Sequence, residues 1–300
     1  MLRCTRQVPK GASFDNSVEA FLRVNDDLVI KESSFMVDGI GGTTWDGSLV
    51  LMWFLLKYRD ALSSMMKEFS PSLQILELGA GCGVVSLFVS KIGGFSVTCT
   101  DREVDLIEEN MQRNNVSTGH MNVHTLNWGD TKKTIGPGTT SSFLNTTVDR
   151  LSSGNRYSII CGAEIVVLNK QHDILIDTVD ANADDDTLIL FTFDELSASS
   201  QGVLYKKQFI EKMSRKGYQC RNMMDGEVSW SKVLNIDDAN VFNDFVASIR
   251  VNGEIKESNV IEEGAIHTES LRFERSTQHH LLAFYKNEAS VALSMAMYII

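Results

Sequence analysis

The sequence predicts an α/β protein built on a mostly parallel sheet of seven strands, with helices on both faces and an antiparallel last strand. Short apolar runs alternate with segments of helical character along the chain, which is the pattern of strands joined by crossover helices. A glycine-rich turn at Gly79–Gly83 follows one apolar run, and Asp101 follows the next. A turn of this kind, between a strand and a helix, lies where open parallel sheets bind nucleotides.

The individual elements follow from length and apolar periodicity. Seven strands are expected, at Leu73–Leu78, Phe95–Thr100, Met121–Leu126, Tyr157–Cys161, Thr187–Phe193, Tyr218–Asn222 and Leu281–Tyr285. Helices are expected at Asp46–Tyr58, Val84–Ile92, Glu103–Val116, Lys170–Ala183 and Val203–Lys216. Asp46 is a suitable N-cap for the first of these helices, because its side chain can accept a hydrogen bond from an unpaired helix amide.

The chain divides into residues 1–44, expected to be an N-terminal arm and cap segment, and a single domain over residues 45–300. Two stretches without apolar periodicity, at about 136–156 and 225–275, are expected to be loop insertions. Arg3, Arg6 and Lys10 with no nearby acid are compatible with a targeting leader, but Pro9 and the short length favour a disordered arm.

The composition of the chain limits which classes of molecule it is expected to bind. The formal net charge of −11 argues against a nucleic-acid binder, and no segment is long enough to span a membrane. The five cysteines are scattered without a C-x-x-C pair, and the six histidines lack metal-ligand spacing, so we expect reduced thiols and no metal. Reduced thiols favour the cytoplasm, with the nucleus as a second compartment, and we expect a monomer. The net charge is compatible with a basic protein as substrate.

The glycine turn differs from a dinucleotide fingerprint in two ways. Its spacing is G-x-G-x-G, at Gly79, Gly81 and Gly83, and the bulky Val84 stands where a third glycine of G-x-G-x-x-G would be. Glu77 precedes the turn, and a carboxylate there repels a pyrophosphate but suits a cation. S-adenosylmethionine carries a sulfonium and an ammonium group, so the sequence favours this cofactor over NAD, with Asp101 accepting hydrogen bonds from the ribose.

Three further motifs, together with the glycine turn, match the pattern of a known protein family. Trp45 precedes the first helix, paired asparagines stand four residues apart at Asn110 and Asn114, and Asn127-Trp128 follows the third strand. Together with Leu76–Gly83 they resemble the non-histone protein lysine methyltransferases, a family of class I, Rossmann-like, seven-strand methyltransferases. The resemblance covers about residues 35–218. The family has aspartate where Asn127 stands, and an asparagine carbonyl can still contact the exocyclic amine of adenine.

The resemblance implies roles for these residues. Glu77 and the three glycines would shape the methionine end of the cofactor, with Ala163 also in contact with it. Asn127 and Trp128 would bind the adenine, and Trp45 would cover the cofactor as a lid, with a core aromatic as the alternative for Trp45 and a hydrophobic plug for Trp128. Asn110 and Asn114 are expected to organise their helix and the neighbouring loop rather than to touch a ligand.

The main departure from the family lies at the end of the fourth strand. The family has aspartate, two apolar residues and tyrosine there, whereas this chain has Glu164-Ile165-Val166-Val167. Glu164 is the candidate catalytic residue, holding the target amine and helping to take up its proton, with a purely structural carboxylate as the alternative. Val167 removes the aromatic wall, for which Phe193 is a candidate replacement. Asp194-Glu195 could attract a basic peptide, although a solvated strand end is slightly favoured.

The resemblance thus implies an S-adenosylmethionine-dependent methyltransferase acting on a protein side chain, with a lysine ε-amine as the favoured acceptor. Methylation of a protein histidine or of a small molecule is the alternative among enzymes. A catalytically weak cofactor-binding module that holds a partner protein is the alternative from another class. A dehydrogenase is disfavoured by Glu77 and Val84.

Overall fold

The computed structural model describes residues 4–9, 19–25, 27–33, 39–60, 62, 73–129, 157–166, 169–194, 200–223, 266–269 and 279–286. The expected insertion at 136–156 and most of the one at 225–275 lie outside the described residues. Within the described part, no helix combines the length and apolar character needed to cross a membrane.

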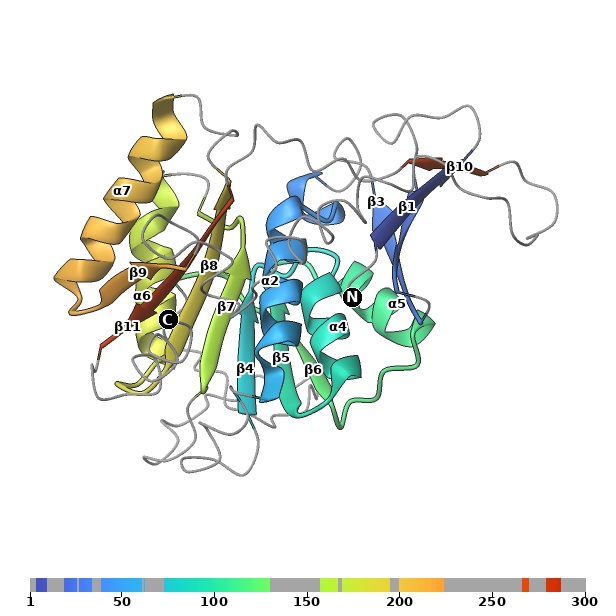
Figure 1. Ribbon diagram of the computed structural model, residues 1–300, viewed down its shortest axis with the longest axis horizontal. Coiled ribbons are helices and arrows are strands. Elements are labelled where there is room, and N and C mark those ends of the chain that lie inside the picture. Colours follow the sequence, from blue (N-terminus) through green and yellow to red (C-terminus); the bar gives the residue numbers. More distant parts are fainter. Residues whose placement is uncertain are drawn as a thin grey trace, which may run out of the picture.

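The central feature is a seven-stranded sheet with the strand order β6-β5-β4-β7-β8-β11-β9 (Figure 1). Its strands are β4 (Leu73–Leu78), β5 (Phe95–Asp101), β6 (Met121–Thr125), β7 (Ile159–Ala163), β8 (Leu188–Asp194), β9 (Gln219–Asn222) and β11 (His279–Tyr285). The pairs from β6 across to β8 are parallel, and β11 is antiparallel to both β8 and β9. The expected fold class, including the single antiparallel last strand, is therefore confirmed.

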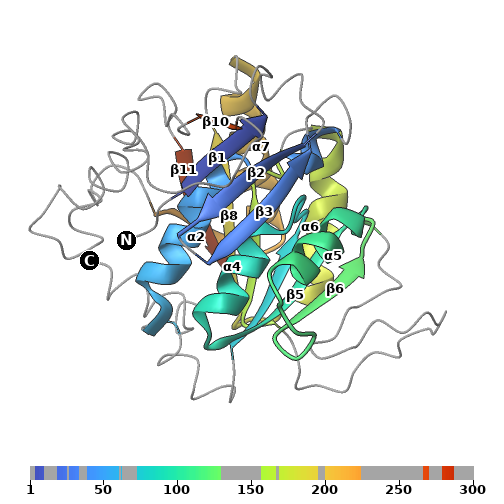
Figure 2. The ribbon, with the colours of Figure 1, turned by 90° about the vertical axis from the view of Figure 1, so that its right-hand side faces the viewer.

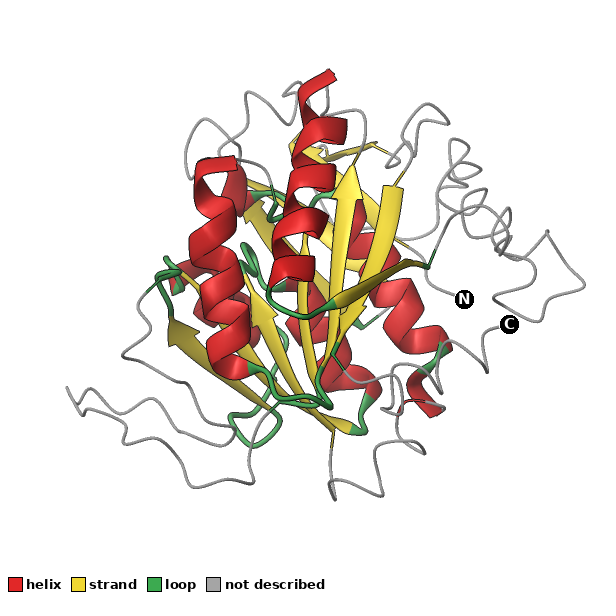
Figure 3. Ribbon diagram, turned by 90° about the vertical axis from the view of Figure 1, so that its left-hand side faces the viewer, coloured by secondary structure: helices red, strands yellow, loops and turns green. Residues whose placement is uncertain are grey.

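Helices cover both faces of this sheet, as Figure 3 shows. One face carries α2 (Asp46–Lys57), α4 (Val84–Ile92) and α5 (Asp105–Arg113), and the other carries α6 (His172–Asn182) and α7 (Ser200–Arg215), with a 3-10 turn, η3 (Asn169–Gln171), before α6. Alternate strand residues supply the two cores: Leu73 and Ile75 pack on the α2–α4 side, and Leu76 and Leu78 on the α6–α7 side.

A second, four-stranded antiparallel sheet was not expected from the sequence. It has the order β10-β1-β2-β3 and consists of β1 (Cys4–Pro9), β2 (Glu19–Val24), β3 (Leu28–Ser33) and β10 (Ile266–Glu269). Figure 2 shows it lying across the α4 and α5 side of the molecule. Residues 4–9, expected to belong to a disordered arm, thus form a strand.

This N-terminal sheet is held to the domain by its apolar face. Leu22, Val24, Leu28 and Ile30 are buried in the same core as α2 and α4. They alternate along β2 and β3, so they point to one side of the hairpin, and Asn25 turns the chain between the strands with a φ of 52°. Burial of this face against the domain makes the sheet a part of the core.

The start of α2 differs from the expectation by one residue. Trp45, not Asp46, is the N-cap, with the extended backbone angles φ −90° and ψ 156°, and Asp46 is the first helical residue. The N-cap makes no side-chain capping bond. Asp46 instead lies in the first turn, where its negative charge interacts favourably with the helix dipole.

Candidate functional site

The site lies at the carboxyl edge of the parallel strands, where the chain leaves β4 and β7 toward opposite sides of the sheet. β4 and β7 are hydrogen-bonded neighbours in the middle of the sheet. Open α/β sheets bind their ligands in the crevice at such a switch point. The glycine turn follows β4, and Glu164 directly follows β7, so the structure brings the two strongest sequence candidates to one place.

The glycine turn needs its glycines for both conformation and space. Gly79 and Gly81 have φ values of +63° and +59°, and residues that carry a side chain rarely adopt such backbone angles. A Cβ on Gly79 would lie 2.8 Å from Cγ2 of Ile165 and 3.2 Å from the ring of Trp128, and one on Gly81 would lie 2.6 Å from the carbonyl oxygen of Gly41. The turn is therefore packed between the end of β7, the turn after β6 and the segment before α2.

Glu77 supports this turn from inside the protein. Its side chain is 2% exposed and stands opposite Cys99 and Cys161 on the neighbouring strands. Oε2 accepts hydrogen bonds from the backbone N–H of Ser86, at 2.9 Å, and from the Ser86 hydroxyl. The carboxylate thus satisfies an otherwise unpaired amide in the first turn of α4, whose N-cap Gly83 has no side chain to do so. Burial raises the pKa of Glu77 to about 7, although the two bonds from Ser86 oppose the rise.

Asp101 ties the glycine turn to the end of β5. Its Oδ2 accepts a hydrogen bond from the N–H of Gly81 at 2.8 Å, and its Oδ1 accepts one from the N–H of Arg102 at 2.7 Å. A carboxylate oxygen has two acceptor lone pairs, so Oδ2 can also accept a hydrogen bond from a ligand hydroxyl.

The turn after β6 lies against the glycine turn. Trp128 is half-buried and its ring faces Gly79, whereas Asn127 is exposed. Two hydrogen bonds fix the turn: the N–H of Leu126 donates to the Asp101 carbonyl at 2.8 Å, and the N–H of Gly129 donates to the Thr178 hydroxyl at 2.9 Å. Asn127 and Trp128 are thus placed at the same edge as the glycine turn and Asp101.

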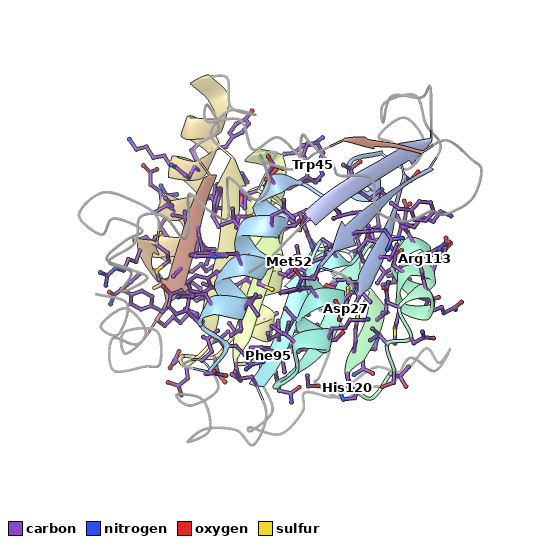
Figure 4. All side chains as sticks on the ribbon, turned by 45° about the vertical axis from the view of Figure 1, so that its right-hand side comes forward. Asp27, Trp45, Met52, Phe95, Arg113 and His120 are labelled. Carbon is purple, nitrogen blue, oxygen red and sulfur yellow. The ribbon has the colours of Figure 1, made fainter. Side chains whose placement is uncertain are left out.

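Trp45 lies at the same edge of the sheet, at the N-terminal end of α2. Figure 4 shows it far from Phe95, the first residue of β5, which marks the opposite edge of the sheet. With 43% of its surface exposed, Trp45 is one of two large apolar side chains that are exposed in the described part of the chain. An indole so exposed is not a core aromatic, which was the alternative to a lid.

Glu164 is held by the first turn of α2. Its Oε1 accepts a hydrogen bond from the N–H of Gly47 at 2.5 Å, and its own N–H donates to the carbonyl of Thr192 at 3.1 Å. Gly47 has to be a glycine, because a Cβ there would lie 2.4 Å from the Thr192 hydroxyl and 2.7 Å from Oε1 of Glu164. Glu164 also has a φ of 53°, a strained value for a side-chain residue and one that clusters at functional sites.

The structure places two of the other candidate residues near β7 and β8, Ala163 and Phe193. Ala163 ends β7 and is half-buried beside Glu164. Phe193 is 5% exposed and packs on Phe209 of α7, with ring centroids 6.0 Å apart, so it belongs to the core and does not replace a channel aromatic. Val167, the side chain of Asp194, and Glu195 lie outside the described residues.

Several residues around the site were missed by reasoning from the sequence. Gly47 approaches Glu164, Thr178 holds the turn after β6, and Ile165 packs on Gly79. A glycine in the first turn of a helix is an available signal for Gly47, whereas nothing local distinguishes Thr178 or Ile165. Among the described residues, no group of three or more His, Cys, Asp or Glu side chains could hold a metal ion.

The chain is similar in sequence and in fold to several known proteins. The chain is 28% identical over 159 residues to protein N-lysine methyltransferase METTL21A of Danio rerio, which covers 51% of this chain and 61% of that protein. It is 29% identical over 143 residues to EEF1A lysine methyltransferase 3 of Xenopus tropicalis, covering 47% of this chain and 52% of that protein. The crystal structure of P. horikoshii TYW2 in complex with MeSAdo overlaps with a TM-score of 0.44 at 14% identity, over 90% of this chain and 72% of that chain.

These alignments span less than two thirds of the length of either relative. The family profile described as "Lysine methyltransferase" covers more of the chain, since it matches residues 23–216. This region contains the glycine turn, Asp101, the turn after β6 and Glu164. Because the match extends over well over half of the sequence, the chain belongs to the lysine methyltransferase family.

Proposed function

We propose that the protein is an S-adenosylmethionine-dependent methyltransferase that modifies a protein side chain, with a lysine ε-amine as the acceptor. Membership of the lysine methyltransferase family supports this proposal, as do the named activities of the two relatives. The bound cofactor would supply a methyl group on a sulfonium. An unprotonated amine would attack this methyl carbon in line, so that the N–C bond forms as the C–S bond breaks and S-adenosylhomocysteine leaves.

The residues at the carboxyl edge are suited to hold this cofactor. The glycine turn, supported by Glu77 and flanked by Ala163, would surround the methionine end. Asp101 would accept hydrogen bonds from the ribose through its remaining lone pairs, because its backbone contacts leave acceptor capacity. The exposed amide of Asn127 and the ring of Trp128 would bind the adenine, and the exposed indole of Trp45 would cover the site.

The observation that carries the acceptor assignment is the position of Glu164. Its carboxylate lies at the switch point next to the glycine turn and is fixed by the Gly47 N–H. A fixed carboxylate can accept hydrogen bonds from a lysine amine, orient its lone pair and hold the proton that the nitrogen loses. It also carries the negative charge that attracts a lysine side chain to the site.

The test separates this role from a purely structural one. Glu164→Gln keeps an oxygen that can accept the Gly47 hydrogen bond but loses the charge, whereas Glu164→Ala loses both. We expect both variants to bind S-adenosylmethionine like the wild type and to transfer methyl at least about tenfold more slowly. If Glu164→Gln transferred at the wild-type rate, the carboxylate would be structural.

The acceptor is identified by incubating the wild-type protein with tritium-labelled cofactor and a cell lysate, then mapping the label. A label on lysine supports the proposal, and a label on histidine or on a small molecule replaces it with the corresponding alternative. Cofactor binding without any labelled product would favour an interaction module.

We also propose a cytoplasmic location. All five cysteines of the chain are free thiols, and four of them are buried. Free cysteines without disulfides are typical of proteins from reducing compartments. The expectations of a monomer without nucleic-acid or membrane partners stay predictions.

A further inference from the structure

Two buried asparagines, Asn110 in α5 and Asn114 at the C-cap of this helix, hold the N-terminal sheet by its edge strand β3. The amide of Asn114 accepts a hydrogen bond from the N–H of Val29 at 2.8 Å and donates to the carbonyl of Val29 at 2.7 Å. The amide of Asn110 does the same with Lys31, at 2.7 Å and 2.9 Å. Each side chain thereby makes the pair of bonds that a neighbouring strand would make.

The spacing of the two elements explains why this pairing works. Residues four apart on a helix rise by about 6 Å along its axis. Alternate residues on a strand lie about 6.6 Å apart and offer their N–H and C=O groups to the same side. Asn110 and Asn114 therefore meet Val29 and Lys31 in register, and the edge of β3 is satisfied by side chains of α5.

Asn110 makes one contact that Asn114 does not. Its Nδ2 also donates to the carbonyl of Cys82, at 3.0 Å, in the middle of the glycine turn. Asn110 is 0% exposed, so a single buried amide joins β3 to the turn. The partner carbonyl stands between Gly81 and Gly83, both with positive φ. Because glycines have no Cβ, their own sterics restrict the conformation of the turn little.

The segment after β3 also packs on the glycine turn. Glu32 of β3 is buried and accepts a hydrogen bond from the N–H of Thr44 at 2.7 Å. The Thr44 hydroxyl lies 3.2 Å from Sγ of Cys82, and Gly41 lies over Gly81. The position of β3 is thus connected to the glycine turn and to Trp45, the residue that follows Thr44.

We propose that Asn110 is a positioning residue for the cofactor site, through which the N-terminal sheet fixes the conformation of the glycine turn. This inference rests on the proposed function, since it requires that the cofactor bind at that turn. The side-chain amide of Asn110 bonds to backbone groups of Lys31 and Cys82. It acts by holding the Cys82 carbonyl, so that the backbone groups of the turn face the cofactor without further ordering.

The first test compares Asn110→Ala with Asn114→Ala. The two residues form a matched pair, because both are buried, one within α5 and one at its C-cap, and each makes three side-chain hydrogen bonds. S-adenosylmethionine affinity is measured by calorimetry at a temperature where circular dichroism shows both variants folded. We expect a loss of at least about tenfold for Asn110→Ala and less than about threefold for Asn114→Ala. The KM for the cofactor should rise more than kcat falls.

The outcomes distinguish this inference from the proposed function. Equal losses in the two variants, or no loss in Asn110→Ala, would show that the asparagines only stabilise the fold and would overturn the inference. Absence of binding by the wild-type protein would refute the proposed function itself, and the inference with it.

A second measurement uses only the wild-type protein and so does not depend on the folding of a variant. If the position of β3 favours cofactor binding, cofactor binding must favour the position of β3 to the same degree. Saturating S-adenosylmethionine should therefore slow hydrogen exchange of the Val29 and Lys31 amides as well as of the glycine turn, while the pairing of β9 with β11 serves as the remote control. Protection confined to the turn would contradict the proposal.

Discussion

The buried carboxyl of Glu77 gives a prediction that can be followed through in numbers. Glu77 has an ordinary pKa of 4.5 and a folded-state pKa raised to about 7 by burial. Between these values the folded protein keeps the proton and the unfolded chain has released it. Stability must therefore fall as the pH rises through this window, because the unfolded state binds fewer protons there.

The size of the effect follows from the two pKa values. One pKa unit corresponds to about 1.4 kcal/mol, so the rise from 4.5 to about 7 corresponds to roughly 3 kcal/mol of unfolding free energy. The contribution is fully present below pH 4.5 and is lost by about pH 7. For a domain of this size, such a loss is a substantial fraction of total stability.

The assay is urea unfolding of the wild type and of Glu77→Gln across this pH window. The amide does not titrate, so the difference in unfolding free energy between the two proteins should change by roughly 3 kcal/mol in favour of the variant as the pH rises. Any constant cost of the amide cancels in this comparison. Ser86→Ala is the control, since removing the hydroxyl bond should raise the pKa of Glu77 further and extend the window upward. Parallel pH curves for the wild type and Glu77→Gln would refute the reasoning.

Three further outcomes are expected. Gly81→Ala should lose more stability and cofactor affinity than Gly93→Ala: both residues have positive φ, worth about 1 kcal/mol, but only a Cβ on Gly81 meets a backbone oxygen, while Gly93 has open space. Thermal unfolding and calorimetry check this, and equal effects would count against close packing of the turn. Thr178→Val should cost about 1 kcal/mol by removing the hydrogen bond to the Gly129 N–H and should raise the cofactor KM, with Thr178→Ser restoring both; unchanged kinetics in the valine variant would show that the turn after β6 does not depend on this bond. Burial alone would raise the pKa of Asp180, but hydrogen bonds from a lysine and a tyrosine lower it. Asp180→Asn should therefore cost about 1 kcal/mol at neutral pH and nothing at a pH well below 3.8, as measured by urea unfolding; a pH-independent cost would exclude an ionic contribution.

The central sheet could be predicted because each of its strands is marked in the sequence by a short apolar run. The runs at Leu73–Leu78 and Val84–Ile92 match β4 and α4 at both ends, and the remaining boundaries shift by a few residues. The site edge followed from the same information, since residues just after parallel strands must meet at one edge of the sheet.

The N-terminal sheet could not be predicted as a whole, because its edge strand β10 pairs with β1, which lies far away in the sequence. The β2–β3 hairpin did carry a local signal, with Leu22, Val24, Leu28 and Ile30 alternating around a turn at Asn25. The position of β10 beside β1 has no such signal. The expected role of Asn110 and Asn114 in organising their surroundings agrees with their contacts, although their strand partners were not foreseen.

The order in which the two sheets close has a consequence for synthesis of the protein. β11 lies between β8 and β9, so β9 has no neighbour in the large sheet until the chain has been made as far as residue 285. In the small sheet, β1 pairs with β10, which joins Arg6 to Glu269. A chain emerging from the ribosome therefore exposes an unpaired strand edge in the small sheet until residue 269 has been made, and one in the large sheet until residue 285 has been made. Chaperones that shield such edges would act on the chain during that interval.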